Sequence, residues 1–353
     1  MSLHSNTVDI KALLGFNLGF ICPPTAADHS KGVLLLGPQN ASETRPSHTP
    51  AAAFGSDLGK IASKAAMDDL HTRRFEGIAA VPDAIRGKVE WLFKGLTPQQ
   101  KTQLWIDEVA VHSVTQSQIA EQITEITAKA LRAAGIVVRD AIVVDAMACV
   151  GGNTLSFART FKTTHAVEIS STRYECLQHN IQVMGLSDQV SVHCGDALAA
   201  ISAAKECRKV RAAASAAPLA AAAAAASGAG STRGVSQLPA HVDAVFFDPP
   251  WGGPEYAAMP SIDMYVGDMH LGGALQRCAG WAGMAVVKAP LNFNIQGMLE
   301  RAGGCAKLTQ DPVQLRKMQV MTVALQANIA ASAVRDPAAD AGAPPSAKRA
   351  RGV

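Results

Sequence analysis

The sequence has little of what membrane, secreted or zinc-binding proteins carry. Its 353 residues contain no apolar run of the roughly 20 residues that a bilayer-spanning helix needs. The first ten residues lack the basic-then-apolar order of a secretory signal peptide. The seven cysteines are scattered and form no Cys-x-x-Cys pair, which argues against a zinc ribbon and a disulfide framework. We therefore expect a soluble, intracellular protein without a metal site.

The chain also carries little net charge. The net charge of +3 at pH 7 is too small for a surface that coats nucleic acid broadly, although a local basic pocket is compatible with it. The apolar fraction of 48% and the charged fraction of 17% are those of a globular protein with alanine-rich additions.

Three regions have too little apolar periodicity to build a core. Residues 1–88 are predicted to form a weakly structured extension with local helices, and a divergent substrate-binding arm is the alternative. The alanine-, serine- and glycine-rich insertion at 209–238 is predicted to lie on the surface. Residues 331–353 are predicted to be a disordered tail, whose Lys348–Arg351 cluster is either a solvated end or a nuclear-import signal.

Residues 89–330 alternate apolar strands with amphipathic helices, which predicts a doubly wound, mostly parallel α/β sheet with a helical N-terminal extension. The expected strands are 141–145, 164–168, 190–193, 242–247, 284–288 and 320–325. Expected helices include 97–109, a helix opened by a capping box of Thr115 and Gln118, 154–160, and one with Leu177 and Ile181 on its buried face.

Asp145 ends the first of these strands and precedes a turn of small residues. Ligands bind at the carboxyl ends of strands in an open parallel sheet, and Gly151 and Gly152 would allow the backbone to approach a ligand closely. The turn is not Gly-x-Gly-x-x-Gly, and an acid stands before the glycines. It therefore fits a cationic amino-acid group, such as the methionine part of S-adenosylmethionine, better than a pyrophosphate.

Two more acids follow the next two strands. Glu168 could accept both hydroxyl groups of a ribose, or simply be favourable at a helix N-terminus. Asp196 could accept a hydrogen bond from an adenine amino group, or be an ordinary turn aspartate. Taken singly, each residue leaves both interpretations open.

The most specific motif is Asp248-Pro249-Pro250-Trp251, which follows a buried strand. The two prolines fix the backbone, so that the Asp248 carboxylate and the Pro249 carbonyl could both accept from an exocyclic amine. Such contacts would aim the nitrogen lone pair at a methyl donor, and positioning would supply most of the catalysis. Trp251 would stack on the base, a contact worth about 1–3 kcal/mol. The four ordered elements predict an S-adenosylmethionine-dependent methyltransferase acting on a nucleic-acid base.

At these residues the chain resembles the trimethylguanosine synthases, which are RNA cap guanine-N2 methyltransferases. The resemblance covers about 89–327 without the insertion and is carried by Ser113–Glu121, Val143–Ala158, Asn180–Gly185 and Pro249–Tyr256. Pro-Pro-Trp-Gly-Gly-Pro followed by an acid and a tyrosine is specific to that family. The resemblance implies a Rossmann-like class I fold, S-adenosylmethionine as cofactor, and a guanine already methylated at N7 as substrate.

By position, the resemblance also assigns individual residues. Trp251 would stack on the cap base, Asn180 would hydrogen-bond to it, and Tyr256 would contact the cap phosphates. Lys288 could substitute for a phosphate-facing family arginine that Leu291 replaces here. Residues expected to bind the cofactor are Thr115, Asp145, Met147, Gly151, Asn153, Glu168, Asp196 and Ala197. The implied partner is a capped small nuclear or nucleolar RNA, bound by a monomer that resides in the nucleus or nucleolus with a cytoplasmic pool.

Some residues depart from the family pattern. Cys149 stands where the family has glycine, which would cost about 1–2 kcal/mol if the position needs φ > 0. Leu291 replaces an arginine that would face the triphosphate, Glu168 replaces an aspartate, and Asp248 stands where animal members have serine. Two other functions therefore stay open: an N-methyltransferase of internal rRNA or DNA bases, and a cap-binding module with weakened catalysis.

Overall fold

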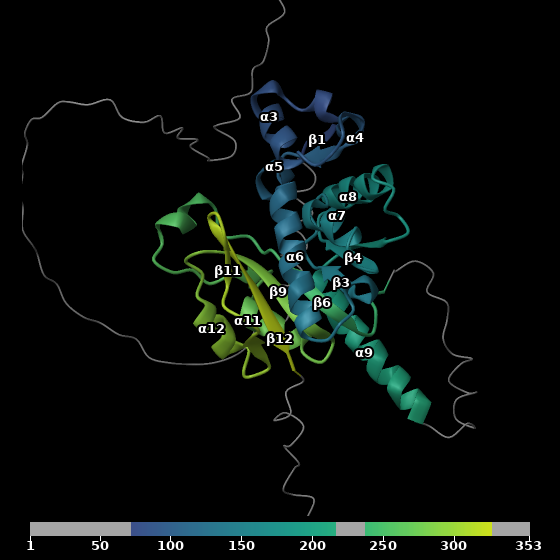
Figure 1. Ribbon diagram of the computed structural model, residues 1–353, viewed down its shortest axis with the longest axis vertical. Coiled ribbons are helices and arrows are strands. Elements are labelled where there is room, and N and C mark those ends of the chain that lie inside the picture. Colours follow the sequence, from purple (N-terminus) through teal and green to yellow (C-terminus); the bar gives the residue numbers. More distant parts are fainter. Residues whose placement is uncertain (1–71, 217–236, 327–353) are drawn as a thin grey trace, which may run out of the picture. The chain divides into compact units, whose positions relative to one another are not determined.

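The computed structural model describes residues 72–216 and 237–326 (Figure 1). The helices are α3 Asp83–Leu92, α4 Pro98–Gln103, α5 Ala110–Ser113, α6 Ser117–Ala133, α7 Gly152–Ala158, α8 Ser171–Val183, α9 Ala197–Ala216, α11 Leu271–Cys278 and α12 Ile295–Arg301, with 3-10 turns η1 Ile78–Ala80, η2 Val138–Asp140 and η3 Pro254–Ala258. The strands are β1 Arg74–Glu76, β2 Trp105–Asp107, β3 Ile142–Asp145, β4 Thr163–Glu168, β5 Val190–Cys194, β6 Val242–Phe247, β7 Tyr265–Val266, β8 Met269–His270, β9 Ala282–Pro290, β10 Ala306–Leu308, β11 Val313–Leu315 and β12 Met318–Leu325.

An eight-stranded sheet organises the fold, with strand order β10-β12-β9-β6-β3-β4-β5 and β11 paired to β12. Neighbours from β9 to β5 are parallel, whereas β12 runs antiparallel to β9. The chain moves outward from β3 to β5 and then returns to β6 on the other side of β3. The predicted doubly wound, mostly parallel sheet is therefore confirmed, and its strand order reverses between β3 and β6.

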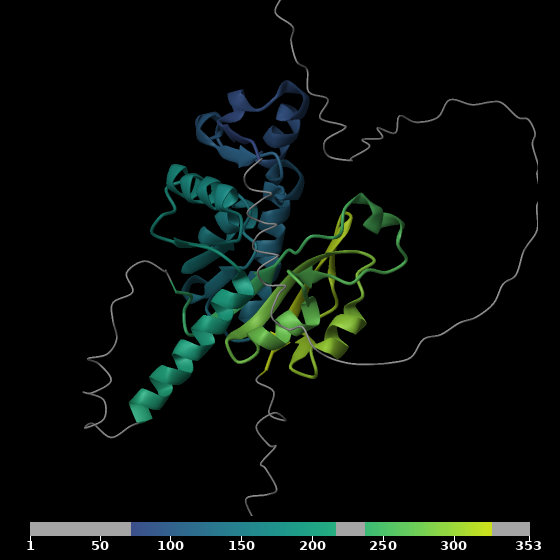
Figure 2. The same ribbon diagram turned by 180° about the vertical axis from the view of Figure 1, so that it is seen from behind.

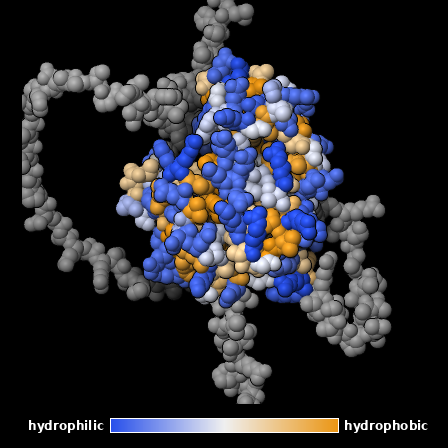
Figure 3. All heavy atoms as spheres, in the orientation of Figure 1, coloured by the Kyte–Doolittle hydropathy of each residue, from blue (hydrophilic) through white to orange (hydrophobic). Residues whose placement is uncertain are grey.

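Alternate residues of each strand pack on opposite faces of this sheet. Val143 and Phe246 pack with α6 and α7, whereas Val144 and Phe247 belong to the core beneath α9, α11 and α12. Figures 1 and 2 show α6 on one face and α11 on the other. Seen from the α6 side, the surface over this helix is hydrophilic to neutral, because its apolar stripe faces the sheet (Figure 3).

A small N-terminal unit packs on α8 and on the turn after β3. It consists of the β1–β2 pair with η1, α3, α4 and α5, and its buried side chains include Phe75, Val89 and Ile106. Val150 of the turn and Cys176 of α8 complete the same cluster. The helical N-terminal extension is thus an ordered part of the fold from residue 72 onward.

The structure corrects the expected boundaries here. The predicted division at residue 88 is wrong, because α3 crosses it and β1 pairs with β2 beyond it. The prediction of one helix over 97–109 is wrong: the segment forms α4 and then strand β2. β2 is a strand because it pairs with β1, which lies about 30 residues earlier in the chain. α9 also enters the predicted insertion, while most of that insertion and the C-terminal tail lie outside the described residues.

The predicted capping box of Thr115 and Gln118 is wrong as well. Gln116 is the N-cap of α6, and its side-chain oxygen accepts from the Ile119 amide at 3.1 Å. The Thr115 hydroxyl points instead toward the motif that contains Asp248.

Neither a membrane span nor a metal cluster is found in the described ranges. Over 72–216 and 237–326, no helix combines the length and the apolar character needed to cross a bilayer. The same ranges contain no group of three histidine, cysteine or acidic side chains arranged to hold a metal ion.

Candidate functional site

The predicted site residues meet where the strand order reverses. β3 and β6 lie side by side and parallel, with Asp145 paired to Phe246, so Asp145 and Asp248 emerge at the same edge of the sheet. This switch point is where open α/β sheets bind their ligands. The adjacent strand β9 brings Lys288 to the same edge.

The turn after β3 depends on two unusual backbone positions. Cys149 has φ +51° and Gly151 has φ +107°, so Cys149 meets the condition under which it would cost about 1–2 kcal/mol relative to the family glycine. Gly152 is needed for a different reason, since a Cβ there would lie 2.7 Å from the Thr115 carbonyl oxygen. The turn is thereby pressed against the segment that leads into α6.

Replacing Cys149 separates backbone strain from side-chain packing. We expect Cys149→Gly to unfold with a free energy about 1 kcal/mol higher than Cys149→Ala, because only glycine adopts φ > 0 without a Cβ penalty. The two variants lack the thiol equally, so each is the control for the other. Urea denaturation measures the difference, and equal free energies of unfolding would show that this position carries no strain.

Asp145 is fully buried and only half satisfied. Its Oδ2 accepts from the Thr154 hydroxyl at 2.6 Å, whereas Oδ1 has no hydrogen-bond partner within the described residues. Oδ1 of the buried Asn153 is also without a partner there. Burial raises the pKa of Asp145 to about 7; the Thr154 hydrogen bond opposes this shift and the charge of Asp248 adds to it. Two buried acceptors are thus available to a ligand that donates hydrogen bonds and carries positive charge.

Thr115 connects the Asp248 motif, the start of α7 and strand β9. Its hydroxyl donates to Asp248 Oδ2 at 3.2 Å and accepts from Asn153 Nδ2 and from Lys288 Nζ, both at 3.0 Å. Lys288 also donates to Asp248 Oδ2 at 2.7 Å, forming an ion pair with only 8% and 12% of the two side chains exposed. Asp248 Oδ2 is therefore occupied from within the protein, and no donor from the described residues reaches Oδ1.

Trp251 is held by contacts with its ring. Tyr256 lies edge-on to it, with ring centroids 5.2 Å apart, and Lys288 Nζ lies 5.5 Å from the Trp251 centroid. The Trp251 Nε1 atom is buried without a partner in the described residues. An aromatic ring fixed beside a carboxylate is suited to stack a base whose amine reaches Asp248.

Glu168 stabilises the turn after β3 through hydrogen bonds. One carboxylate oxygen accepts from the Cys149 amide at 2.8 Å, and the other from the Ser170 amide and from Arg173 Nε. Arg173 also pairs with the fully buried Asp107. A ribose would therefore have to share a carboxylate that is already engaged, and binding of the ribose by Glu168 stays a prediction.

Two residues assigned to the cap have partners inside the protein. Asn180 is completely buried: its Oδ1 accepts from the Trp105 amide, and its Nδ2 donates to the Trp105 and Val150 carbonyls. Both of its N–H groups are used, so it ties α8 to β2 rather than reading a base. Lys288 is paired with Asp248 inside the site, and its contact with a phosphate stays a prediction.

The remaining predicted residues lie at the same edge or near it. Asp196 is exposed and its Oδ1 accepts from the Ala199 amide at the start of α9, next to the buried Ala197. Met147 is half-buried in the turn, Pro249 is buried and Pro250 is exposed. The expected contacts of these residues and of Tyr256 with cofactor or cap stay predictions.

Sequence reasoning missed Arg173, Asp107 and Thr154. Thr154 could have been found, since a threonine in the first turn of the helix after Asp145 faces back toward that strand end. Arg173 and Asp107 gave no local signal, because their pairing joins α8 to a strand that the sequence had assigned to a helix.

Comparison with solved structures returns weak likenesses. The Methanobacterium thermoautotrophicum precorrin 8w decarboxylase is 14% identical, with a TM-score of 0.34 over 57% of this chain and 89% of that one. The M. jannaschii tRNA m1G37 methyltransferase is 12% identical, with a TM-score of 0.33 over 64% of this chain and 53% of that one.

Comparison of sequences is more specific. The uncharacterized protein L320 of Acanthamoeba polyphaga mimivirus is 22% identical over 253 residues, which are 66% of this chain and 83% of that protein. Residues 140–297 match the family model described as RNA cap guanine-N2 methyltransferase. That range contains the turn after β3, Glu168, Asp196 and the Asp248–Trp251 motif, so the resemblance inferred from these motifs is confirmed.

Proposed function

We propose that this protein, a Rossmann-like class I methyltransferase, transfers methyl groups from S-adenosylmethionine to the guanine N2 of an m7G RNA cap. The observation that carries the proposal is the meeting of Asp248-Pro249-Pro250-Trp251 with the half-satisfied Asp145 at the point where the strand order reverses. The Asp248 motif is suited to hold the amine of a base, and Asp145 is suited to hold a cationic ligand beside it.

The residues present fit the cofactor. The free Oδ1 atoms of Asp145 and Asn153 can accept from its ammonium group. Glu168 and Asp196 follow the adjacent strands β4 and β5 and would hold the ribose and the adenine. When bound, S-adenosylmethionine supplies an electrophilic methyl group. The protein contributes position: Asp248 Oδ1 and the Pro249 carbonyl are available to accept both hydrogens of an exocyclic amine, which leaves its lone pair directed away from them.

The raised pKa of Asp145 predicts how cofactor affinity depends on pH. The ammonium group pairs with a carboxylate and not with a carboxylic acid, so the association constant for S-adenosylhomocysteine should rise by close to tenfold per pH unit below about 7 and then level off. Calorimetric titration between pH 5.5 and 8 measures this, with Asp145→Asn as the control that removes the slope. A flat profile in the natural protein, or the same slope in Asp145→Asn, would contradict the pairing.

The same pKa has a consequence for stability without ligand. The folded chain keeps a proton on Asp145 that the unfolded chain releases above about pH 4. This group therefore favours the folded state most below pH 4, and its contribution to the free energy of unfolding decreases as the pH rises toward 7.

Cap dependence is the direct test of the function. The full chain, incubated with labelled S-adenosylmethionine, should methylate m7GpppA dinucleotide and m7G-capped RNA, and should leave GpppA unmodified. Mass spectrometry of the digested product locates the methyl group at N2. Absence of transfer to any m7G substrate would overturn the proposal.

One observation favours a second candidate. Lys288, expected to replace the cation missing at Leu291, is held by Asp248 instead, so the cap triphosphate loses a predicted partner. An N-methyltransferase of internal RNA or DNA bases would need no such cation. Equal transfer to capped and uncapped RNA would support this candidate.

The proposal extends to partner and compartment. A small capped RNA is the partner whose chemistry suits Trp251, because N7 methylation makes the ring cationic and strengthens its stacking on an aromatic face. The basic Lys348–Arg351 cluster supports nuclear residence. Imaging of the tagged full chain, with and without this cluster, tests the compartment.

A further inference from the structure

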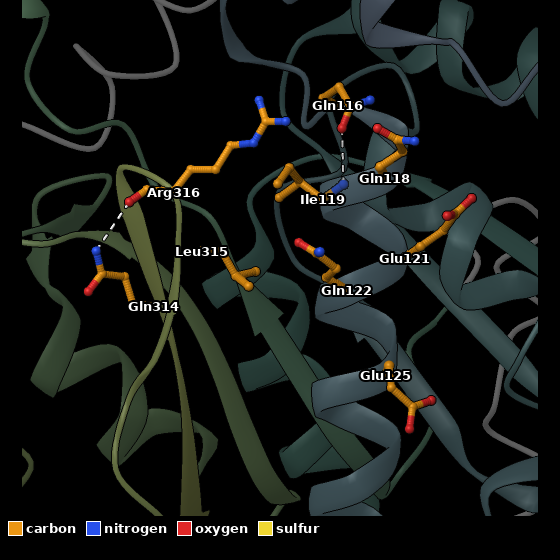
Figure 4. A pocket seen from close by; sticks show the side chains of 9 residues that line it. All are labelled: Gln116, Gln118, Ile119, Glu121, Gln122, Glu125, Gln314, Leu315 and Arg316. Atoms are coloured by element: carbon orange, nitrogen blue, oxygen red, sulfur yellow. Dashed lines mark hydrogen bonds between the residues drawn. The ribbon is translucent and has the colours of Figure 1, made fainter.

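A hollow of about 620 Å³ lies between the first turns of α6 and the β11–β12 hairpin (Figure 4). We call it the hairpin groove; the lining residues that matter here are Gln116, Ile119, Gln122, Gln314, Leu315 and Arg316. Ile119 is buried and Leu315 half-buried, whereas the glutamine amides and the guanidinium are polar. The groove thus combines an apolar floor with hydrogen-bonding groups that suit a nucleotide.

Arg316 occupies a strained position at the hairpin tip. Leu315 pairs with Met318, so Arg316 and Lys317 form a two-residue connection, and Arg316 has φ +53°. This conformation favours glycine at such a position in a tight hairpin. The Gln314 side chain holds the tip by donating to the Arg316 carbonyl at 3.3 Å. Arg316 has a backbone conformation that favours glycine, so its presence there suggests that its side chain has a function that offsets the cost of the strain.

The charges around the groove favour an anion near Arg316. Figure 4 shows the Arg316 side chain extending from the hairpin toward Gln116, while Glu121 and Glu125 point away from the hairpin. Glu125 is paired with Arg132, and no ion pair among the described residues engages Arg316. Its positive charge is therefore available at the mouth of the groove.

One wall of the groove adjoins a residue that contacts the Asp248 motif, and the other adjoins the end of β9. Gln116 directly follows Thr115, whose hydroxyl contacts Asp248. The hairpin continues the end of β9: Met318 pairs with Pro290, and Gln319 Nε2 donates to the Pro290 and Leu291 carbonyls. Both walls are thus continuous along the chain with the edge of the sheet that carries Asp248 and Lys288.

From these contacts we infer that the hairpin groove binds the RNA chain that follows the methylated base, with Arg316 contacting its phosphodiester backbone. The inference rests on the proposed RNA substrate. The apolar floor of Ile119 and Leu315 packs against a ribose or a base, and the exposed amide of Gln122 bonds to a base edge or a ribose hydroxyl. Since Arg316 is the one cation among the lining residues, beside several amides and two acids that point away from the hairpin, the groove takes single-stranded RNA and not a broad duplex surface.

The test measures binding of ten-nucleotide RNAs, m7G-capped and uncapped, to the full chain by fluorescence anisotropy over a range of salt concentrations. Arg316→Gly removes the charge and relieves the strained φ. It should weaken binding of both RNAs about fivefold at 0.1 M salt and reduce the slope of log K against log salt by about 0.7, the value for one phosphate contact. It should leave the affinity for m7GpppA dinucleotide unchanged and resist urea better than Arg316→Ala.

Two further variants make the result specific. Arg316→Lys keeps the charge and should retain most of the affinity, whereas Arg277→Ala removes an exposed arginine on α11 and should change nothing. Unchanged RNA affinity and salt slope in Arg316→Gly would overturn the inference, as would an equal loss in Arg277→Ala. Equal losses for dinucleotide and RNA would place Arg316 at the cap instead. Binding of the uncapped RNA tests the groove even if no cap methylation is found.

Discussion

Replacing Asp248 with asparagine is expected to reduce the rate of methyl transfer at saturating substrate at least about 100-fold and also to destabilise the fold. The rate falls because the carboxylate that positions the amine is lost, and misplacement of a reacting group by about 1 Å can cost this much. The fold loses about 3 kcal/mol because Lys288, with 8% of its side chain exposed, keeps its charge without its partner.

A second replacement separates the two effects. Lys288→Met in the Asp248→Asn background removes the unpaired charge, so the free energy of unfolding should recover while methyl transfer stays low. The four proteins of this cycle are compared by urea denaturation and by single-turnover transfer from labelled S-adenosylmethionine. Recovery of activity together with stability would mean that Asp248 acts only as the counterion of Lys288. A rate for Asp248→Asn within tenfold of the natural protein would remove Asp248 from the reaction.

Replacing Trp251 with alanine is expected to lower kcat/KM for m7GpppA about 10- to 100-fold and to abolish the preference for the N7-methylated cap. Stacking contributes about 1–3 kcal/mol, and a cationic ring adds about 0.5–2 kcal/mol on an aromatic face. Tyr256 packs edge-on against Trp251, so the ring is already oriented before a base arrives. Trp251→Phe keeps an aromatic face and should lose less than the alanine variant.

The matched control is Trp91→Ala, because Trp91 is an exposed tryptophan on α3 with 47% of its surface accessible. Its loss should leave kcat/KM for the dinucleotide unchanged. The measurement is the ratio of kcat/KM for m7GpppA and GpppA in each variant. An undiminished ratio in Trp251→Ala would assign cap discrimination to another residue.

Local sequence signals were sufficient for the parallel strands. β3, β4, β5 and β6 lie within one residue of their predicted bounds, because each is a short apolar run closed by an acid or a turn. The same signals failed for β1, β2 and β11, which are three residues long and become strands only through their partners. A partner distant in sequence leaves no periodicity in so short a segment.

Individual side chains also divide into those predictable from local sequence and those that depend on a distant partner. The acceptors at Asp145 and Asp248 were predictable, since they stand at strand ends beside a small-residue turn and a double proline. The bonds of Asn180 were not predictable, because its position in a motif says nothing of the Trp105 backbone that pairs with its amide. The ion pair of Arg173 could not be predicted for a related reason: its partner Asp107 comes close only when β2 packs on α8.

The sequence by itself determined the class of enzyme, a methyltransferase, through its Asp-Pro-Pro-Trp motif, the small-residue turn after Asp145, and the alternation of strands and helices that brings both to one edge of the sheet. Tertiary structure alone decided how those groups are occupied. Lys288 pairs with Asp248, Thr115 joins three segments, and Arg316 faces a groove, because hydrogen bonds and ion pairs form between side chains that are distant in sequence and close only after folding.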